Sequence, residues 1–265
     1  WCIPPDDHHT YANYGIHHPF KLKHLKHEGF VNANNSPQAM FSFENIQQLN
    51  STPNVRESGH NFDQELFDNF QDGSNLDGFC QTEKYFKHIE NEIREDFEFK
   101  DDILQPCKEF IDEYEKIIFL HVRRGDNVGR EDYHPIVSFD YYDRARKYFD
   151  DDVNILVCTD DPEWCSEQSY FDDDRFLLNT DVPRYDHLCL EGDGTHKHSC
   201  VPYTDLCLMS LCQGAILAPS TLGWWGAWLQ NGKGPVVAPK KWFGSKMSHL
   251  DLSDLFPDNW ITLDD

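Results

Sequence analysis

The chain has 265 residues, 39% of them hydrophobic, which is enough to bury one large or two modest apolar cores. Asp and Glu number 47 against 23 Lys and Arg, and the resulting net charge of −24 argues against nucleic acid or an anionic membrane as the partner. No run of 18 apolar residues is present and the first residues do not resemble a signal peptide, so we expect no membrane-spanning segment.

Residues 1–115 are predicted to form a separate N-terminal lobe. Residues 1–60 are rich in Asn, His and Pro with weak periodicity, which indicates an irregular or lid-like region. Residues 84–115 carry an apolar face at helical spacing, and Pro106 is predicted to open a second helix that runs through Tyr114.

From residue 116 onwards, short apolar runs alternate with helical patterns. We predict strands at 116–121, 153–158, 176–178, 215–218 and 236–238. Helices are predicted at 140–149, 162–169 and 205–212, and another is predicted to start at 224–229. This alternation predicts an α/β fold with a parallel, doubly wound sheet in a second lobe over residues 116–265.

The cysteines and histidines are weak evidence for a disulfide or a metal. The nine cysteines are an odd number, and Cys189 and Cys200 bracket a polar, Gly-rich loop that a local disulfide could close. His196, His198 and Cys200 have a spacing that could hold zinc, but no second clear Cys or His pair accompanies them. No metal site is therefore predicted.

Two adjacent arginines follow the first strand of the second lobe, between His121 and Asp126. Ligands of open parallel sheets bind outside the carboxyl ends of the strands. Arg123 and Arg124 would offer fixed, permanently charged forks of donors there, which suit a diphosphate. The alternative is a surface arginine pair that forms ion pairs with some of the many carboxylates. From these residues alone, both interpretations stay open.

A second segment, residues 203–229, favours the phosphate interpretation. Ser220 and Thr221 lie in a turn between a predicted strand and a predicted helix, where hydroxyl and backbone N–H groups suit a phosphate. The alternative is that the two are simple N-caps and that Trp224, Trp225 and Trp228 belong to the core. For the tryptophans, the core is the favoured interpretation.

Several motifs in chain order resemble one family. The sequence His-Val-Arg-Arg-Gly-Asp at 121–126 and the segment 220–229, with its Trp-Trp pair, carry most of the resemblance. The segments that begin at Gly78, Phe139, Val157 and Asp205 agree with the same pattern in order. From about residue 64 to about residue 244, the chain resembles the α-1,2-fucosyltransferases of glycosyltransferase family 11.

The resemblance implies a GT-B fold with two Rossmann-like lobes and an inverting, metal-independent transfer of L-fucose from GDP-fucose. No further cofactor is expected, and the acceptor would be the 2-hydroxyl of a terminal galactose or similar sugar of an oligosaccharide or glycoconjugate. Family members usually open with a strand and a Gly-Gly-x-Gly-Asn-Gln loop, which this chain lacks. The N-terminal, acceptor-side lobe is thus expected to be incomplete or divergent. A cytoplasmic protein of bacterial or viral type is expected rather than one of the Golgi lumen.

The same resemblance suggests roles for the donor-side residues. Arg123 and Arg124 are expected to neutralise the departing diphosphate, and Ser220 and Thr221 to hold the same phosphates. Asp205 is expected to anchor the guanine or ribose of GDP-fucose, or else to be a helix N-cap. The remaining donor-side candidates are Asp160, Trp224 and Trp225.

Inversion also needs a base near the acceptor hydroxyl. Asp126 is the first candidate, and its alternative role is to orient Arg124 or to cap the following turn. His121 is a further catalytic candidate beside Arg124, although a histidine at a strand end more often orients a neighbour or packs. Glu131 and His134 are held in reserve.

Two rival interpretations remain. Asp160 and Asp161 could hold manganese in a metal-dependent nucleotide-sugar transferase, although they do not form an Asp-x-Asp motif and the arginines already supply positive charge. Alternatively, the chain could be a catalytically inactive sugar- or nucleotide-binding module, which would bind its ligand without transfer.

Overall fold

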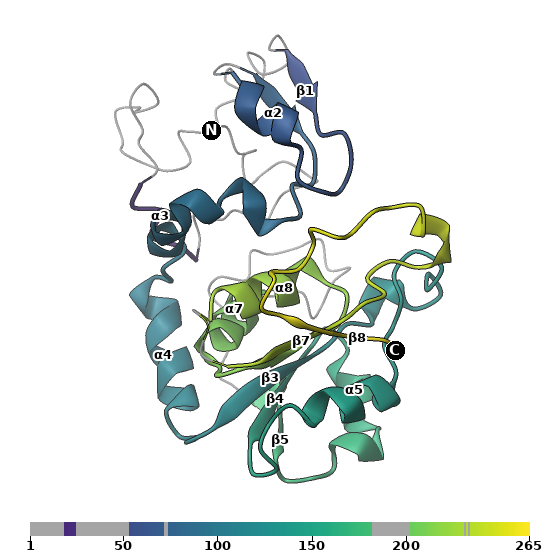
Figure 1. Ribbon diagram of the computed structural model, residues 1–265. Helices are drawn as coiled ribbons and strands as arrows, with labels where there is room; N and C mark the ends of the chain where they lie inside the picture. The colour runs from purple at the N-terminus through teal and green to yellow at the C-terminus, as the bar shows by residue number, and fades with distance from the viewer. Residues whose placement is uncertain (1–18, 25–52, 72–73, 182–201, 231, 233) are drawn as a thin grey trace, which may run out of the picture. The chain divides into compact units, whose positions relative to one another are not determined.

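The computed structural model describes residues 19–24, 53–71, 74–181, 202–230, 232 and 234–265 (Figure 1). Two compact units are present: Trp1–Lys100 with Leu250–Pro257, and Asp101–His249 with Asp258–Asp265. This division lies 15 residues before the boundary expected at 115/116, because helix α4 (Asp101–Ile111) packs against helix α7 (Pro202–Leu211) of the second unit. The predicted acceptor and donor roles of the two parts stay predictions. The proposed Cys189–Cys200 loop and its histidines lie outside the described residues.

The second unit is built on a six-stranded parallel sheet. Its strands, in spatial order, are β5 (Phe176–Leu178), β4 (Asn154–Thr159), β3 (Ile117–Val122), β6 (Ala215–Ile216), β7 (Val236–Pro239) and β8 (Ile261–Leu263). Neighbouring strands are all parallel, and β3 pairs with β4 from Ile117 opposite Asn154 to Val122 opposite Thr159. The predicted α/β class with a parallel sheet is confirmed.

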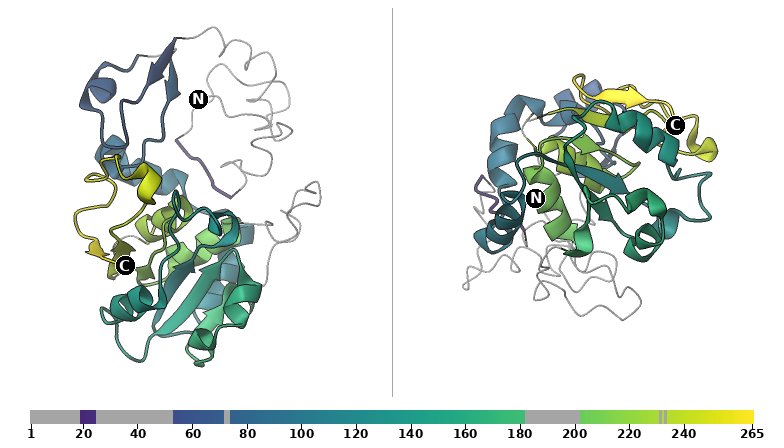
Figure 2. Two further views of the ribbon diagram at one scale, coloured as in Figure 1. Left: turned by 90° about the vertical axis from the view of Figure 1, so that its right-hand side faces the viewer. Right: turned by 90° about the horizontal axis from the view of Figure 1, so that it is seen from below.

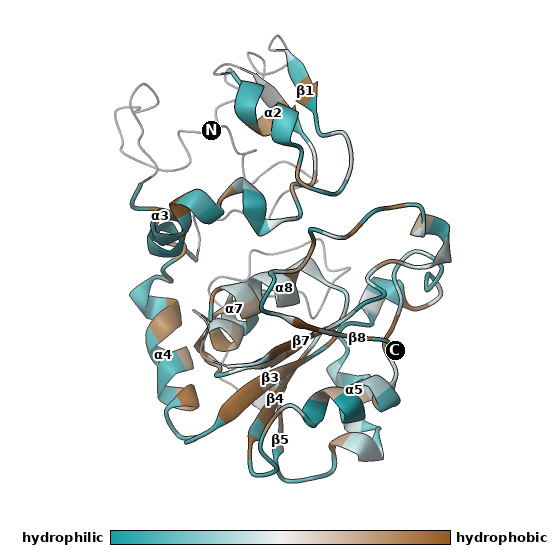
Figure 3. Cartoon of the chain, viewed as in Figure 1, coloured by the Kyte–Doolittle hydropathy of each residue, from teal (hydrophilic) through white to brown (hydrophobic). Residues whose placement is uncertain are grey.

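Helices cover both faces of this sheet (Figures 1 and 2). Helix α5 (Phe139–Arg146) lies on one face, while α7 and α8 (Thr221–Trp228) lie on the other and pack against each other. Because both faces are covered, the central strands need apolar residues throughout, and all six residues of β3 are buried. Figure 3 shows β3 and β4 as hydrophobic strands.

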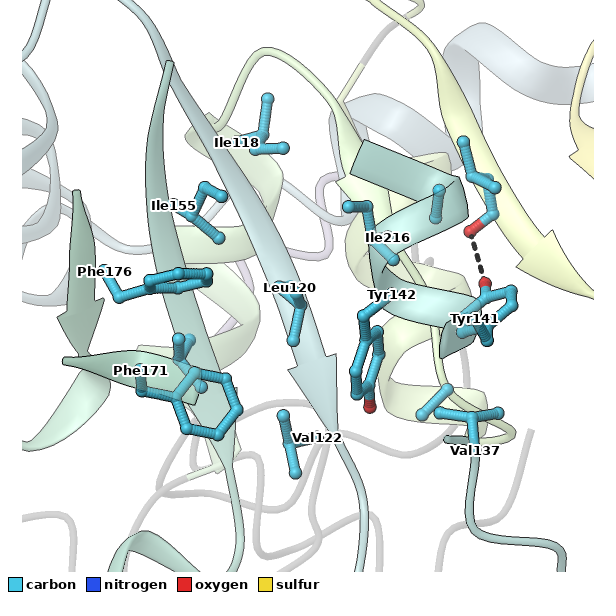
Figure 4. Packing of buried hydrophobic residues seen from close by; sticks show 14 of the residues in the cluster. Ile118, Leu120, Val122, Val137, Tyr141, Tyr142, Ile155, Phe171, Phe176 and Ile216 are labelled. Carbon is cyan, nitrogen blue, oxygen red and sulfur yellow. Dashed lines mark hydrogen bonds between the residues drawn. The ribbon is translucent and has the colours of Figure 1, made fainter. Parts of the chain in front are cut away.

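The face under α5 holds a continuous apolar cluster (Figure 4). Alternate residues of β3, including Leu120, meet residues of β4 and β6 and the aromatic rings of α5. Tyr141 is fully buried, and its hydroxyl donates to the carbonyl oxygens of Leu217 (2.9 Å) and Val237 (3.2 Å). Each fully buried aliphatic or aromatic side chain contributes about 1.5–3 kcal/mol to folding, so this cluster supplies much of the stability of the sheet.

Helix ends follow from local chemistry, with some corrections to the predicted bounds. Ser138 caps α5, and Asp161 caps the short helix α6 (Pro162–Ser166), whose first residue is a proline as predicted. Pro106 does not start a helix; it lies inside α4, where burial of Ile103 and Cys107 offsets the lost backbone hydrogen bond. Helices α7 and α8 begin at Pro202 and Thr221, three residues before each predicted start.

The first unit contains a small parallel pair that the sequence did not predict. Strand β1 (Asn54–Arg56) pairs with β2 (Asn75–Asp77), and helix α2 (Gln64–Asn69) connects them. Two 3₁₀ turns, Glu83–Tyr85 and Lys87–Ile89, precede helix α3 (Glu90–Asp96), so the predicted single helix is interrupted. Among the described residues, no helix is long and apolar enough to cross a bilayer.

Candidate active site

The strand order places one topological switch point, between β3 and β6. The order β5-β4-β3-β6-β7-β8 corresponds to the 3-2-1-4-5-6 order of Rossmann folds, in which the chain leaves the central pair of strands in opposite directions. Ligands of such sheets bind outside the carboxyl ends of the strands at that point. Here β3 leads into Arg123 and Arg124, and β6 leads through Leu217–Pro219 into Ser220. The predicted phosphate-binding residues therefore follow the two strands that flank the switch point.

Arg123 is held between two carboxylates. Its two terminal nitrogens donate to Asp160, which follows β4, and to Asp126 in its own loop. The side chain of Asp126 is 65% exposed, whereas that of Asp160 is 29% exposed. The contact with Asp126 is therefore the more solvated of the two and the easier to exchange.

Arg124 is held by the same strand end and by a tryptophan. Its backbone N–H donates to Asp160 Oδ1 (2.9 Å), and its Nε donates to Asp161 Oδ2 (3.2 Å). Its guanidinium carbon lies 3.7 Å from the ring centroid of Trp164 in α6, a cation–π contact worth about 0.5–2 kcal/mol. The guanidinium is thus fixed in position before any ligand binds.

This arrangement combines the two interpretations of the arginine pair. The arginines form ion pairs with carboxylates, and they also lie at the ligand-binding edge of the sheet. Two guanidinium groups face three carboxylates, of Asp126, Asp160 and Asp161, which leaves one excess negative charge. A phosphate that binds Arg123 therefore competes with the carboxylates of Asp126 and Asp160.

Gly125 is required by this packing. Its φ is +23°, and a Cβ at this position would lie 2.2 Å from Asp160 Oδ2. The loop that carries Arg124 and Asp126 can therefore approach Asp160 only because residue 125 has no side chain.

His121 lies beneath the arginines and not in solvent. It is 4% exposed, and burial together with the charge of Arg123 lowers its pKa to about 3, so the ring is neutral at ordinary pH. Gly223 of α8 packs directly on it, since a Cβ there would lie 2.4 Å from His121 Nδ1. This environment favours the orienting role over that of a base, because a buried imidazole does not reach an acceptor from solvent.

Asp205 lies at the same edge of the sheet. Its Oδ2 accepts from Asn179 Nδ2 (3.2 Å), and that nitrogen also donates to the carbonyl oxygen of Thr159 (3.2 Å) at the end of β4. Because α7 begins at Pro202, Asp205 lies in the first turn of the helix and is not its N-cap. The N-cap alternative is wrong, while the role toward GDP-fucose stays a prediction.

The loop before α8 offers polar groups at a helix start. Ser220 is at the N-cap position, but its hydroxyl makes no capping hydrogen bond, and Thr221 is exposed. Trp224 and Trp228 are buried, at 6% and 4% exposure, which agrees with the favoured core interpretation. Trp225 is half-buried and packs edge-on against both.

The reserve candidates lie in the loop after β3. Glu131 is exposed, and a hydrogen bond from the Gly129 N–H (3.0 Å) helps to lower the pKa of its carboxyl. His134 is also exposed and packs near Phe243.

That loop is fastened to the segment after β7. The N–H groups of Gly244 and Lys246 donate to the carbonyl oxygens of Tyr133 (2.8 Å) and Asp132 (2.9 Å). Lys246 Nζ lies 3.2 Å from Asp132 Oδ2.

Trp164 and Asn179 are the site residues that sequence reasoning did not select. The sequence could have indicated Trp164, because it is the third residue after Asp161, the residue that precedes the predicted helix. An N-cap and the third residue after it lie on the same side of a helical turn. Asn179 carries no comparable signal, since its partners come from β4 and α7. Within the described ranges, no group of three or more His, Cys, Asp or Glu side chains is arranged to hold a metal ion.

The fold and the arginine loop at its switch point define the class, an α/β protein with a Rossmann-type ligand-binding domain. Comparison with known families is more specific: the chain belongs to glycosyl transferase family 11, whose model matches residues 58–264. The predicted family is confirmed.

Three curated relatives are named as glycosyltransferases. The O-antigen biosynthesis glycosyltransferase WbnK of Escherichia coli is 31% identical over 63% of this chain and 53% of its own length. An alpha-1,2-colitosyltransferase of Escherichia coli is 28% identical over 96% of this chain and 86% of its own. The human galactoside alpha-(1,2)-fucosyltransferase 1 is 26% identical over 59% of this chain and 43% of its own. The chain thus spans about half the length of the first and third.

Two solved structures show a partial likeness to this chain. NodZ from Bradyrhizobium has a TM-score of 0.41 at 17% identity, over 61% of this chain and 54% of its own. POFUT1 in complex with GDP has a TM-score of 0.42 at 12% identity, over 69% and 61% of the two chains. At these values the likeness supports no residue-level comparison.

Proposed function

We propose that this protein transfers L-fucose from GDP-fucose to the 2-hydroxyl of a terminal galactose, with inversion and without a metal. The observation that carries the proposal is the arginine pair at the switch point of the sheet, held by the carboxylates that follow β4. Membership of family 11 and the names of the relatives, which include alpha-1,2-fucosyltransferases, support it.

In this proposal the donor diphosphate exchanges with Asp126. The side chain of Asp126 is mostly solvated, so it can leave Arg123 for water at little cost when a more highly charged group arrives. Arg123 and Arg124 then stabilise the negative charge that grows on GDP as the bond between the anomeric carbon and the phosphate oxygen breaks. Ser220 and Thr221 supply hydroxyl and N–H donors from the opposite side of the switch point.

The exchange would also provide the base. Once released from Arg123, the Asp126 carboxylate accepts the proton of the acceptor 2-hydroxyl while that oxygen bonds to the anomeric carbon and GDP leaves with the electron pair. His121 is buried and neutral, and its role would be to fix the distance between β3 and α8. Asp205, joined to the end of β4 through Asn179, would contact the guanosine.

The surroundings of Asp160 and Asp161 support a metal-independent reaction. Asp160 accepts from Arg123 through one oxygen and from the Arg124 N–H through the other. Asp161 accepts from Arg124 through one oxygen and from the N–H of Trp164 through the other. A divalent cation would have to displace these donors, and it would compete with two guanidinium groups for the same oxygens.

A second candidate donor is favoured by one specific observation. The relative that covers 96% of this chain is named an alpha-1,2-colitosyltransferase, whereas the human fucosyltransferase covers 59%. Colitose is L-fucose without its 3-hydroxyl, so the same phosphate site would serve both donors. Turnover of GDP-colitose in preference to GDP-fucose would favour this candidate.

Calorimetric titration tests the proposed donor site directly. GDP, GDP-fucose and UDP would be titrated into the protein, first in EDTA and then with Mn²⁺. We expect GDP and GDP-fucose to bind in EDTA and UDP to bind much more weakly. Binding that requires Mn²⁺ would instead favour the metal-dependent interpretation, in which Asp160 and Asp161 hold the cation. Binding without any transfer would indicate the inactive module.

Arg124→Ala should abolish transfer and weaken GDP binding at least about tenfold, because a charge-assisted contact of about 1.5–3 kcal/mol is lost. The matched control is Arg175→Ala. Arg175 also pairs with a carboxylate, of Asp173, but it precedes β5 and so lies at the amino edge of the sheet. Both variants should retain the circular dichroism spectrum of the wild type. Normal turnover in Arg124→Ala would refute the proposed site.

A further inference from the structure

An exposed aromatic ring in the first unit has no role in the donor site. Phe79 is 72% exposed, the highest value among the large apolar side chains that the structure describes as exposed. Its ring stacks on that of His60, with centroids 5.3 Å apart and planes inclined by 24°. The residue belongs to the segment that begins at Gly78, one of the motifs that carry the family resemblance.

The backbone around Phe79 is held rigidly. The buried carboxylate of Glu57 accepts the N–H groups of Phe79 (2.9 Å) and Cys80 (3.0 Å) through Oε2, and the hydroxyl of Tyr85 (2.9 Å) through Oε1. Gly78 allows this approach, since a Cβ there would lie 2.6 Å from Glu57 Cβ. Two of these hydrogen bonds fix the backbone of residues 79 and 80, so the chain that carries the exposed ring is preorganised for a ligand.

The chemistry of the stack suits a sugar ring. The face of an aromatic ring carries negative charge and attracts the weakly positive C–H groups of a pyranose. A β-galactoside presents such a face, because its axial 4-hydroxyl leaves several C–H groups together on one side. Ser58 and Gly59, both exposed, leave room next to the stack.

We propose that Phe79, backed by His60, is a platform on which a β-galactoside unit of the acceptor stacks. The inference rests on the proposed function, because it names the residues that recognise the acceptor of that reaction. It assigns acceptor recognition to the loop 78–82 and its support, Glu57.

The experiment measures lactose recognition separately from donor recognition. Binding of lactose to the protein without nucleotide is followed by saturation-transfer NMR, and KM for lactose is measured at saturating GDP-fucose. The variants are Phe79→Ala, Phe79→Tyr and, as a matched control, Phe70→Ala, which removes another exposed phenylalanine of the same unit. GDP affinity and the melting temperature report whether each variant is folded.

Phe79→Ala should raise KM for lactose about three- to tenfold, as expected for loss of one stacking contact, and should weaken the lactose NMR signal correspondingly. Phe79→Tyr should stay within about twofold of the wild type, and Phe70→Ala should not differ from it. An unchanged KM in a folded Phe79→Ala variant would overturn the proposal, as would a wild-type protein that gives no lactose signal. Lactose binding without donor turnover would instead support the platform and refute the proposed function.

Discussion

At the scale of single residues, the site depends on contacts between charged groups that follow the neighbouring strands β3 and β4. Asp160 joins the two arginines, since one oxygen meets the side chain of Arg123 and the other the backbone of Arg124. Such a contact needs both β3 and β4 to end at the same height, which their register ensures by pairing Val122 with Thr159. The contact between Asp160 and the arginines therefore needs both the spacing of the 121–126 motif after β3 and the register that pairs β3 with β4.

The buried histidine gives the protein a testable pH dependence. The pKa of His121 is about 3 in the folded protein and near 6.5 in the unfolded chain, so only the unfolded chain takes up this proton between those values. The free energy of unfolding should fall by about 2 kcal/mol from pH 7 to pH 5 through this group alone. Urea unfolding of the wild type and of His121→Gln would measure it.

The comparison isolates His121, because all carboxylates are common to the two proteins. His121→Gln should show the shallower pH dependence over this interval, whatever its stability at pH 7. Parallel curves for the two proteins would mean that the imidazole is accessible to protons in the folded state.

At the scale of elements, the loop between β3 and α5 is positioned by a distant part of the chain. A Cβ on Gly244 would lie 2.2 Å from the backbone of Asp132, so the two segments cross with only a glycine between them. The loop includes Asp126, the proposed base, and it receives two backbone hydrogen bonds from the segment after β7. The loop that carries Asp126 is therefore held partly by a segment that lies about 120 residues further along the chain.

Gly244→Ala should separate the two segments, which would lower kcat about tenfold or more and destabilise the protein by about 1–3 kcal/mol. Arg175→Ala is a suitable control, because it also introduces an alanine but precedes β5, away from both segments. Steady-state kinetics and thermal unfolding of both variants would measure the difference. Equal behaviour of the two alanine variants would show that the crossing does not position the loop.

The success of sequence-based prediction varied with the length and burial of each element. Strands β3 and β4 were predicted almost to the residue, because both faces are buried and their apolar runs are continuous. Strands β1, β2 and β8 have three residues each with polar members, so no periodicity marks them. The starts of α7 and α8 were missed because Pro202 and Thr221 precede the apolar residues on which the prediction relied.

The same difference applies to the site. The arginine pair, the acidic pair and the Ser-Thr turn were selected because their residue types suggest chemistry on their own. Their mutual contacts were not predictable, since Arg123 and Asp160 meet only if β3 and β4 are neighbours. The burial of His121 under Gly223 likewise requires knowledge of which helix covers that face of the sheet.

At the scale of the whole molecule, the net charge of −24 opposes an anionic donor. The arginine cluster does not reverse this field, because its own sum is also negative. Association with a nucleoside diphosphate should therefore be slow at low ionic strength and become faster when salt screens the repulsion.

Raising NaCl from 20 to 200 mM should increase the association rate of a fluorescent GDP analogue about two- to threefold. Stopped-flow fluorescence at fixed pH would measure it, with a neutral viscogen as a control for diffusion. A rate that falls with salt would mean that the arginines dominate the approach of the ligand, as in a site with net positive charge.

The pairing of both arginines with carboxylates has a further consequence, for selectivity among anions. The arginines are already paired with aspartates in the absence of a ligand, so an incoming anion must compete with a carboxylate that is already bound. Chloride carries a single charge and gains too little to replace Asp126, whereas the diphosphate of a nucleotide has enough oxygens to contact both guanidinium groups. The protein would therefore remain largely uninhibited by chloride and respond to a diphosphate carried on a nucleoside.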